Sequence, residues 1–195
     1  MSYGFRRSQQ SEALMLAASA GLAETVTALL LSAPGLDVNA ASPLEGRTAL
    51  MMAASQGRAD TVAALLAAAP GLEVNKVDAV YDYTALMMAA IEGHSDTVAV
   101  LLADPKLDVN AVDGEPGYTA LMLAALHGRT EAVEALMSAP GLDVNAANRH
   151  GDTALTLAER EGHTTAITAL QHTPARKWGE ALVRSKWSAA CSSRK

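Results

Sequence analysis

The fold is decided by one stretch, TALMLAALHGRTEAVEALMSAPGLDVN at Thr119–Asn145. It recurs with small changes at Thr48–Asn75 and Thr84–Asn110, and incompletely before and after these copies. The leading threonines Thr48, Thr84, Thr119 and Thr153 are separated by 36, 35 and 34 residues (84−48, 119−84, 153−119). A degenerate first copy, SEALMLAASAG, begins at Ser11. A period in the thirties is typical of a solenoid, in which each unit buries its apolar face against its neighbours. We therefore expect five stacked copies with one modular surface.

Each copy is predicted to form two short helices and an extended segment. Thr48 is a suitable N-cap for the first helix of the second copy, and apolar residues follow at i, i+3 and i+4. Gly57 can end that helix, because a positive φ costs glycine little. The second helix is predicted over Asp60–Ala68 and must stop before Pro70, since proline cannot continue a helix.

This order of elements resembles the ankyrin repeat. The resemblance is carried by the TALMxAAxxG runs, by the TVxALL segments that follow them, and by DVNA at Asp37–Ala40, Asp108–Ala111 and Asp143–Ala146. It covers roughly Ser11 to His172. It implies an all-α solenoid of stacked helix-turn-helix units with projecting β-turn fingers.

The chain is expected to divide into three parts. Residues 1–10 form a flexible N-terminal leader, residues 11–172 the repeat domain, and residues 173–195 a basic C-terminal tail. The five repeats are expected at about 11–40, 41–76, 77–111, 112–146 and 147–172.

The sequence departs from the family pattern at several positions. Alanine replaces the usual proline after each leading threonine, and the helix-to-finger loops are elongated. The family's histidine is replaced by Met51, Met87, Met122 or Thr156, so the hydrogen bonds of that histidine are not expected here. The helical spacing of the methionines predicts core packing instead of a metal site. Asp82 stands where the other fingers have glycine, and we expect a reshaped finger there because aspartate tolerates positive φ less well.

Asparagine recurs in the V-N pair that ends each copy, at Asn39, Asn75, Asn110 and Asn145. Its side-chain amide is expected to hydrogen-bond the loop backbone. The resemblance also implies that this position can be hydroxylated.

Charge and motif searches exclude several functions. The net charge of −6 divides into +5 for residues 173–195 and therefore −11 for the rest, which argues against general nucleic-acid binding by the body. No apolar run is long enough to cross a membrane, and a lone Cys191 fits a reducing compartment. No phosphate-binding loop, nucleophile elbow or metal-binding histidine pair is present. We expect no enzymatic activity, cofactor, metal or small-molecule substrate, and a cytoplasmic monomer, with nuclear location or export to a host left open.

Aromatic residues give the strongest functional signal. Of the four tyrosines, Tyr81, Tyr83 and Tyr118 lie on the fingers, and the last two directly precede a leading threonine. Since stacked helices are about 8–10 Å apart, the three rings are expected to form one exposed cluster. Tyrosine is common at interface hot spots. The alternative is that the rings pack on the next finger and only support it.

The remaining candidate protein-binding residues lie at two kinds of position in the repeat. They occupy finger tips or the end of a repeat's first helix, where the resemblance implies a concave groove. They are Leu44, Arg47, Ser55, Gln56, Val80, Ile91, Glu92, Leu126, His127, His150 and Asp152.

The tail is predicted to form an amphipathic helix, with Trp178 and Leu182 as one i, i+4 pair and Val183 and Trp187 as another. One hypothesis is that it caps the fifth repeat. The other is that its basic and aromatic residues bind an anionic membrane or RNA.

These observations together predict a non-catalytic module that binds a partner protein of unknown identity through finger tips and groove. Two alternatives stay open: a regulatory inhibitor that occludes a partner enzyme, and an adaptor on a membrane or nucleic acid that acts through the tail.

Overall fold

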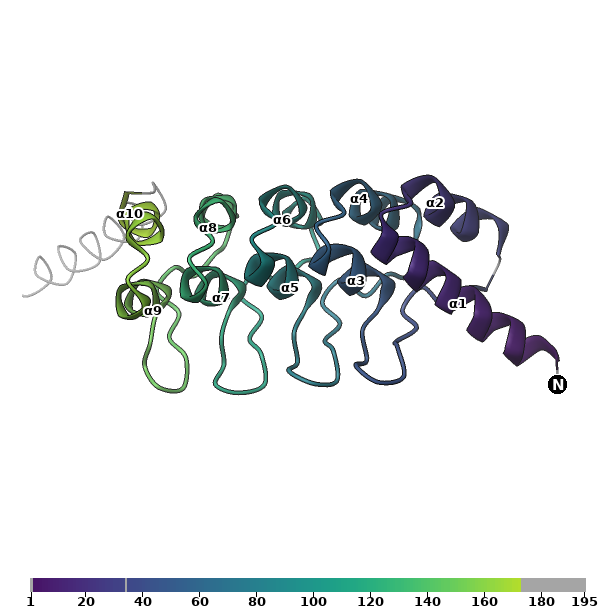
Figure 1. The fold of residues 1–195 in the computed structure, drawn as a ribbon, viewed down its shortest axis with the longest axis horizontal. Helices are drawn as coiled ribbons and strands as arrows, with labels where there is room; N and C mark the ends of the chain where they lie inside the picture. Colours follow the sequence, from purple (N-terminus) through teal and green to yellow (C-terminus); the bar gives the residue numbers. More distant parts are fainter. Residues whose placement is uncertain (1, 34, 173–195) are drawn as a thin grey trace, which may run out of the picture.

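The computed structural model describes residues 2–33 and 35–172, and these fold into two parallel rows of helices (Figure 1). The inner row consists of α1 (Ser2–Ala20), α3 (Ala49–Ser55), α5 (Ala85–Glu92), α7 (Ala120–Leu126) and α9 (Ala154–Glu161). The outer row consists of α2 (Ala23–Ser32), α4 (Ala59–Ala68), α6 (Ser95–Leu102), α8 (Thr130–Met137) and α10 (Thr164–His172). Each helix packs on the next helix of its own row, so the predicted all-α solenoid is confirmed.

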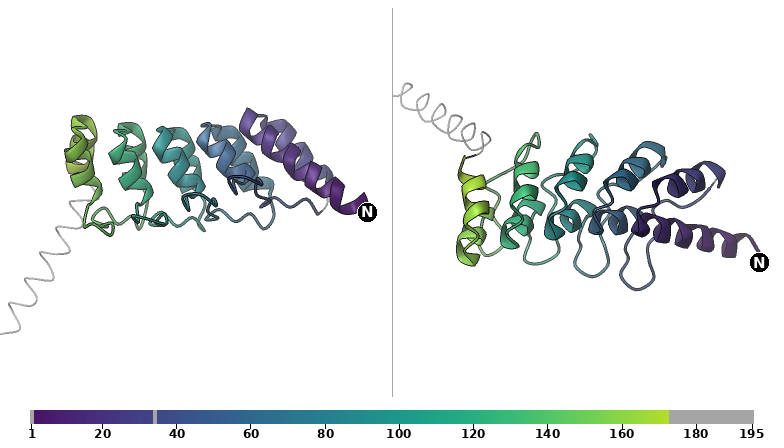
Figure 2. Two further views of the ribbon diagram at one scale, coloured as in Figure 1. Left: turned by 60° about the horizontal axis from the view of Figure 1, so that its bottom comes forward. Right: turned by 45° about the horizontal axis from the view of Figure 1, so that its top comes forward.

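The fingers project from the inner row and lie side by side, as two views agree (Figures 1 and 2). We name each finger after its repeat: finger 2 (residues 41–47), finger 3 (77–83), finger 4 (112–118) and finger 5 (147–152). Among the described residues, β-structure is limited to isolated bridges, Val77 to Thr84 and Val112 to Thr119. The concave side of the solenoid is therefore bordered by fingers and by the inner helices.

The leading threonines cap the inner helices as predicted. The Thr48 hydroxyl accepts a hydrogen bond from the Met51 N–H at 3.3 Å. In return, the Met51 sulfur accepts from the Thr48 N–H at 3.4 Å, and Met87 repeats this contact with Thr84 at 3.5 Å. Methionine thus completes a reciprocal capping box within its own repeat, although sulfur is a weak acceptor.

The core runs through all repeats along the inner helices. Met51, Met87 and Met122 are each 1% exposed, which confirms the prediction that this column packs in the core. Alanines of the inner helices, such as Ala53 and Ala89, are fully buried. Small side chains here let neighbouring helices approach closely, so the stack is tight.

Loop asparagines tie each repeat to the next. The Asn75 amide donates to the Lys106 carbonyl at 2.7 Å, and its carbonyl accepts from the Asp108 N–H at 2.8 Å. Asn39 and Asn110 make the same pair of bonds one repeat before and after. The predicted loop bonding is thus confirmed for three of the four asparagines, and the loop that each one binds belongs to the following repeat.

Arginine and histidine alternate directly after the glycine that ends each inner helix. His94 Nε2 lies 3.2 Å from the Ser55 carbonyl, and Arg129 Nε donates to the Ile91 carbonyl at 2.8 Å. The ring of His94 fills the space that a Cβ on Gly57 would need. Four inner helices, α1, α3, α5 and α7, are therefore closed by a side chain from the following repeat: Arg58, His94, Arg129 and His163.

The structure bears on the prediction for the N-terminal end of the chain but not on the prediction for the C-terminal tail. Residues 2–10, expected as a flexible leader, form the first half of α1 instead, because no proline or glycine cap separates them from the first repeat's helix. The tail, with its cap and anionic-surface hypotheses, lies outside the described residues. Within the described part of the chain, no helix has the length and apolar character needed to span a bilayer.

Candidate protein-interaction surface

A polar side chain holds each finger from inside, and in fingers 3, 4 and 5 this residue is buried. Asp78 Oδ1 accepts from the backbone N–H groups of Tyr81 and Tyr83, at 3.1 and 2.9 Å. Asp113 does the same in finger 4, where it accepts from Gly117 and Tyr118 at 2.8 and 2.6 Å. Ser42 and Asn148 hold the same register in fingers 2 and 5. These residues were not among the predicted site residues, although aspartate recurs six residues before the leading threonine in two copies.

Neighbouring fingers are joined by backbone hydrogen bonds. The Ala79 N–H donates to the Glu45 carbonyl at 2.9 Å, linking fingers 2 and 3. Gly114 donates to Tyr81 at 3.3 Å and Arg149 to Pro116 at 3.0 Å, which extends the link to finger 5. Since every finger is fixed both internally and to its neighbour, side chains on the fingers sit on a preorganised support. A partner that binds them has little ordering cost to meet.

At Asp82, finger 3 keeps the backbone conformation that finger 2 has at Gly46, which corrects the expectation that Asp82 reshapes the finger. Asp82 has φ 58°, close to the 67° of Gly46 at the same position in finger 2. Asparagine and aspartate are the residues other than glycine that visit this region most readily, and the finger's hydrogen bonds hold it there. The Asp82 carboxylate lies directly against Gly114, in space that a side chain on that glycine would occupy.

Two of the three finger tyrosines stack on each other, and Tyr81 is the one that is exposed. The rings of Tyr81 and Tyr83 stack with centroids 5.2 Å apart and an interplanar angle of 27°. Tyr81 is 58% exposed, whereas Tyr83 and Tyr118 are half-buried against the core. Tyr81 is therefore exposed as predicted, whereas Tyr83 and Tyr118 are less exposed than predicted. Those two rings pack against the core, whereas the alternative hypothesis placed them on the next finger.

The charge around Tyr83 is negative. Burial raises the pKa of the Tyr83 hydroxyl above its usual 10.0, and the nearby Asp113 carboxylate raises it further, followed by Tyr81, Asp78 and Tyr118. Both aspartates are buried beneath the fingers. Their charges therefore act on the aromatic surface from below.

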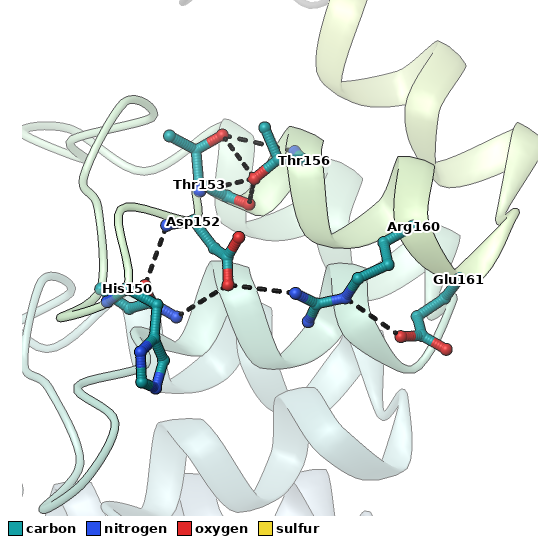
Figure 3. A network of polar contacts seen from close by, with 7 residues as sticks. His150, Asp152, Thr153, Thr156, Arg160 and Glu161 are labelled. Atoms are coloured by element: carbon teal, nitrogen blue, oxygen red, sulfur yellow. Dashed lines mark hydrogen bonds and ion pairs between the residues drawn. The ribbon is translucent and has the colours of Figure 1, made fainter.

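A polar network at the far end of the groove fixes Asp152 (Figure 3). Arg160 donates to the Asp152 carboxylate at 3.1 Å and lies 3.5 Å from Glu161. The pKa of Arg160 is raised, mainly by the hydrogen bond to Asp152 and less by Coulomb attraction to Asp152 and hydrogen bonds to Glu161 and Tyr118. The network joins α9 to finger 5, and the Asp152 carboxylate is thus already paired with Arg160 of the same chain.

The other candidate residues fall into three groups. Leu44, at 92% exposed, and Val80, Gln56, Glu92, His127 and His150 are exposed. Ile91 and Leu126 are half-buried against the core, and Ser55 is half-buried with its hydroxyl bonded to the Met52 carbonyl. Arg47 lies 3.3 Å from Glu45 and 3.9 Å from Asp78, so it links fingers 2 and 3.

A hollow at the other end of the concave side was not anticipated. It has a volume of about 560 Å³ and lies between α1, finger 2 and α3, where Met15, Leu16, Pro43 and Met52 line it. Leu16 is 67% exposed, while Met88 and Leu123 at the equivalent positions are buried.

Comparison with protein families adds to this geometry. The profile described as "Ankyrin repeats (3 copies)" matches residues 14–113 and again residues 106–178. The chain belongs to the ankyrin repeat family. Ankyrin repeats are generally protein–protein interaction modules and are typically non-catalytic. A search of curated proteins found no match.

In this ankyrin repeat protein, the candidate surface is thus built from parts of repeats 3 and 4. We define the tyrosine surface as Tyr81, Asp82, Tyr83, Ile91, Glu92 and Tyr118. Its aromatic part rests on the core, and its exposed part comprises Tyr81 with the carboxylates of Asp82 and Glu92.

Proposed function

We propose that this ankyrin repeat protein is a non-catalytic interaction module whose protein partner docks on the tyrosine surface. The observation that carries the proposal is Tyr81. It is a large aromatic side chain, mostly exposed, stacked on Tyr83 and mounted on a finger held by Asp78 and by neighbouring backbone. Rigid, amphipathic rings of this kind supply binding area at low entropic cost.

The surroundings of Tyr81 supply the rest of an interface. Tyr83 adds apolar area through its stacked ring, and Val80 adds exposed apolar area on the same finger. Asp82 and Glu92 provide a polar rim. Interfaces commonly have this arrangement of an aromatic anchor, a less exposed surround and a charged border.

The test is a single substitution, Tyr81→Ala, in the full chain. A partner captured with the wild-type protein should bind the variant at least about 30-fold more weakly, which corresponds to about 2 kcal/mol for a hot-spot tyrosine. Stability should change little, because the ring is mostly exposed and its removal opens no cavity.

Leu31→Ala is the matched control. Leu31 is 77% exposed at the end of α2 in the outer row, away from the fingers, so its removal should leave binding unchanged. Equal affinity of wild-type and Tyr81→Ala proteins would overturn the proposal. Replacing all three finger tyrosines is a poorer test, because Tyr83 and Tyr118 pack on the core and their loss would also lower stability.

A further inference from the structure

The tyrosine surface carries two exposed carboxylates without a described cation. Asp82 lies on finger 3 and Glu92 at the end of α5, and neither makes an ion pair with a described residue. Below them, the buried Asp113 carboxylate adds negative charge, whereas the buried Asp78 carboxylate is paired with Arg47 at 3.9 Å. A face that combines carboxylates with aromatic rings attracts arginine and lysine, by charge and by cation–π contact.

The arginines of the neighbouring fingers are already engaged. Arg47 pairs with Glu45, and Arg149 lies 3.8 Å from Glu115. Arg160 pairs with Asp152. None of these three contacts Asp82 or Glu92 as an ion pair. Arg129 lies beside Glu92, because its Nε donates to the Ile91 carbonyl and its side chain packs on Gly93, although it makes no ion pair with Glu92. Asp82 has no such described arginine beside it, so a cation for this carboxylate would come from another segment.

The chain itself contains a segment of the matching chemistry. Residues 173–195 carry six basic residues against Glu180 alone, giving +5. They also contain both tryptophans of the chain, Trp178 and Trp187. Basic and aromatic side chains in one segment are complementary to carboxylates and rings in one surface.

Residues 173–195 are long enough to span the distance from the end of α10 to finger 3. Residues 173–195 can extend about 75 Å at ~3.3 Å per residue. Two repeats separate α10 from finger 3, or about 20 Å at ~10 Å per repeat. A segment tethered at this range has an effective concentration of about millimolar, so even weak complementarity leads to occupancy.

The end of the fifth repeat is a poorer site for the same segment. Thr156 and Glu159 are exposed there, at positions that are methionine and alanine in the inner repeats and are buried in them. This end face is thus partly polar and does not offer tryptophan the apolar surface that it prefers.

We propose that residues 173–195 occupy the tyrosine surface of the same chain, with basic residues on Asp82 and Glu92 and tryptophan on Tyr81, and that a partner must displace them. The inference rests on the proposed function of that surface, since residues 173–195 would compete with the partner for the same surface. It also predicts the partner's chemistry, because a segment that displaces this one must carry arginine or lysine.

Tryptophan fluorescence of the full chain tests the proposal, because both tryptophans report on the tail alone. In low salt the wild-type emission should be that of shielded tryptophan. Tyr81→Ala and the double variant Asp82→Asn, Glu92→Gln should each shift it to longer wavelength and increase quenching by acrylamide. About 1 M salt should do the same, because it shortens the screening length from ~10 Å at 0.1 M to ~3 Å.

Glu131→Gln with Glu134→Gln is the matched control, since it removes two exposed carboxylates from α8 in the outer row. It should leave the emission unchanged, and the emission should not depend on protein concentration. Several outcomes overturn the proposal: solvent-exposed tryptophan in the wild type, shielded tryptophan that ignores the Tyr81 and carboxylate variants but responds to Glu159→Gln, or a shift on dilution, which indicates a second copy. If the emission is insensitive while Tyr81→Ala still loses its partner, the inference fails and the proposed function stands.

Discussion

The clearest test of how the repeats hold together is the substitution Asn75→Ala. Asn75 joins the loop of the second repeat to that of the third through two hydrogen bonds, to the Lys106 carbonyl at 2.7 Å and from the Asp108 N–H at 2.8 Å. Alanine removes both bonds and leaves the rest of the loop in place. The side chain is exposed, so no cavity forms.

The magnitude follows from these two bonds. A typical intramolecular hydrogen bond contributes about 0.5–1.5 kcal/mol net. Because water can reach both loop groups after the change, values in the lower half of that range apply, and we expect a loss of about 1–2 kcal/mol. With a urea m-value of about 2 kcal/mol/M, the unfolding midpoint should fall by about 0.5–1 M.

Urea unfolding measures the loss, and native-state hydrogen exchange locates it. The Asp108 amide should lose protection in the variant, because its acceptor is gone. Asn145→Ala is the control: this asparagine has the same place in the fourth repeat, but its side chain bonds to no other described residue. It should change stability by less than about 0.5 kcal/mol. Equal losses for Asn75→Ala and Asn145→Ala would refute the assignment of stability to the inter-repeat bonds.

Two further predictions concern the core and the fingers. Met87→Leu keeps the side-chain volume and loses only the sulfur contact to the Thr84 N–H, so it should lower the free energy of unfolding by less than about 1.5 kcal/mol. Met87→Ala should lower it by about 2–5 kcal/mol, as measured by urea unfolding. Similar losses for the two variants would mean that the sulfur contact dominates. Because the pKa of Tyr83 is raised, the native state keeps the hydroxyl proton to higher pH than the unfolded state. The stability that the protonated Tyr83 contributes is therefore complete below about pH 10 and is lost as pH rises through the native pKa. Unfolding measured at about pH 9 and pH 11 should therefore show a smaller loss of stability in Tyr83→Phe than in the wild type, and equal losses would contradict the burial of this hydroxyl.

The fold was largely predictable because each copy repeats the same local instructions. The leading threonine, the glycine after the inner helix and the Pro-Gly pair mark helix ends by chain-local chemistry, and the period places the copies in register. The helix over Asp60–Ala68 was predicted within one residue of α4. The leader was mispredicted because polar composition outside a repeat resembles a loop, although nothing in residues 2–10 prevents a helix from continuing.

The candidate site was less predictable, since it depends on neighbours in space. Composition placed Tyr81, Tyr83 and Tyr118 on fingers, but only packing separated one exposed ring from two half-buried ones. Asp82 was expected to change its finger because local preference favours glycine, yet hydrogen bonds from the surrounding finger hold it at φ 58°.

The sequence by itself determined the repeating unit and its helix ends, because helix caps, apolar spacing and period are properties of the chain read in order. Only the tertiary structure decided which side chains solvent can reach and which loop each asparagine binds. Those outcomes are set by the adjoining repeat, whose position relative to a given residue is not encoded in that residue's local sequence.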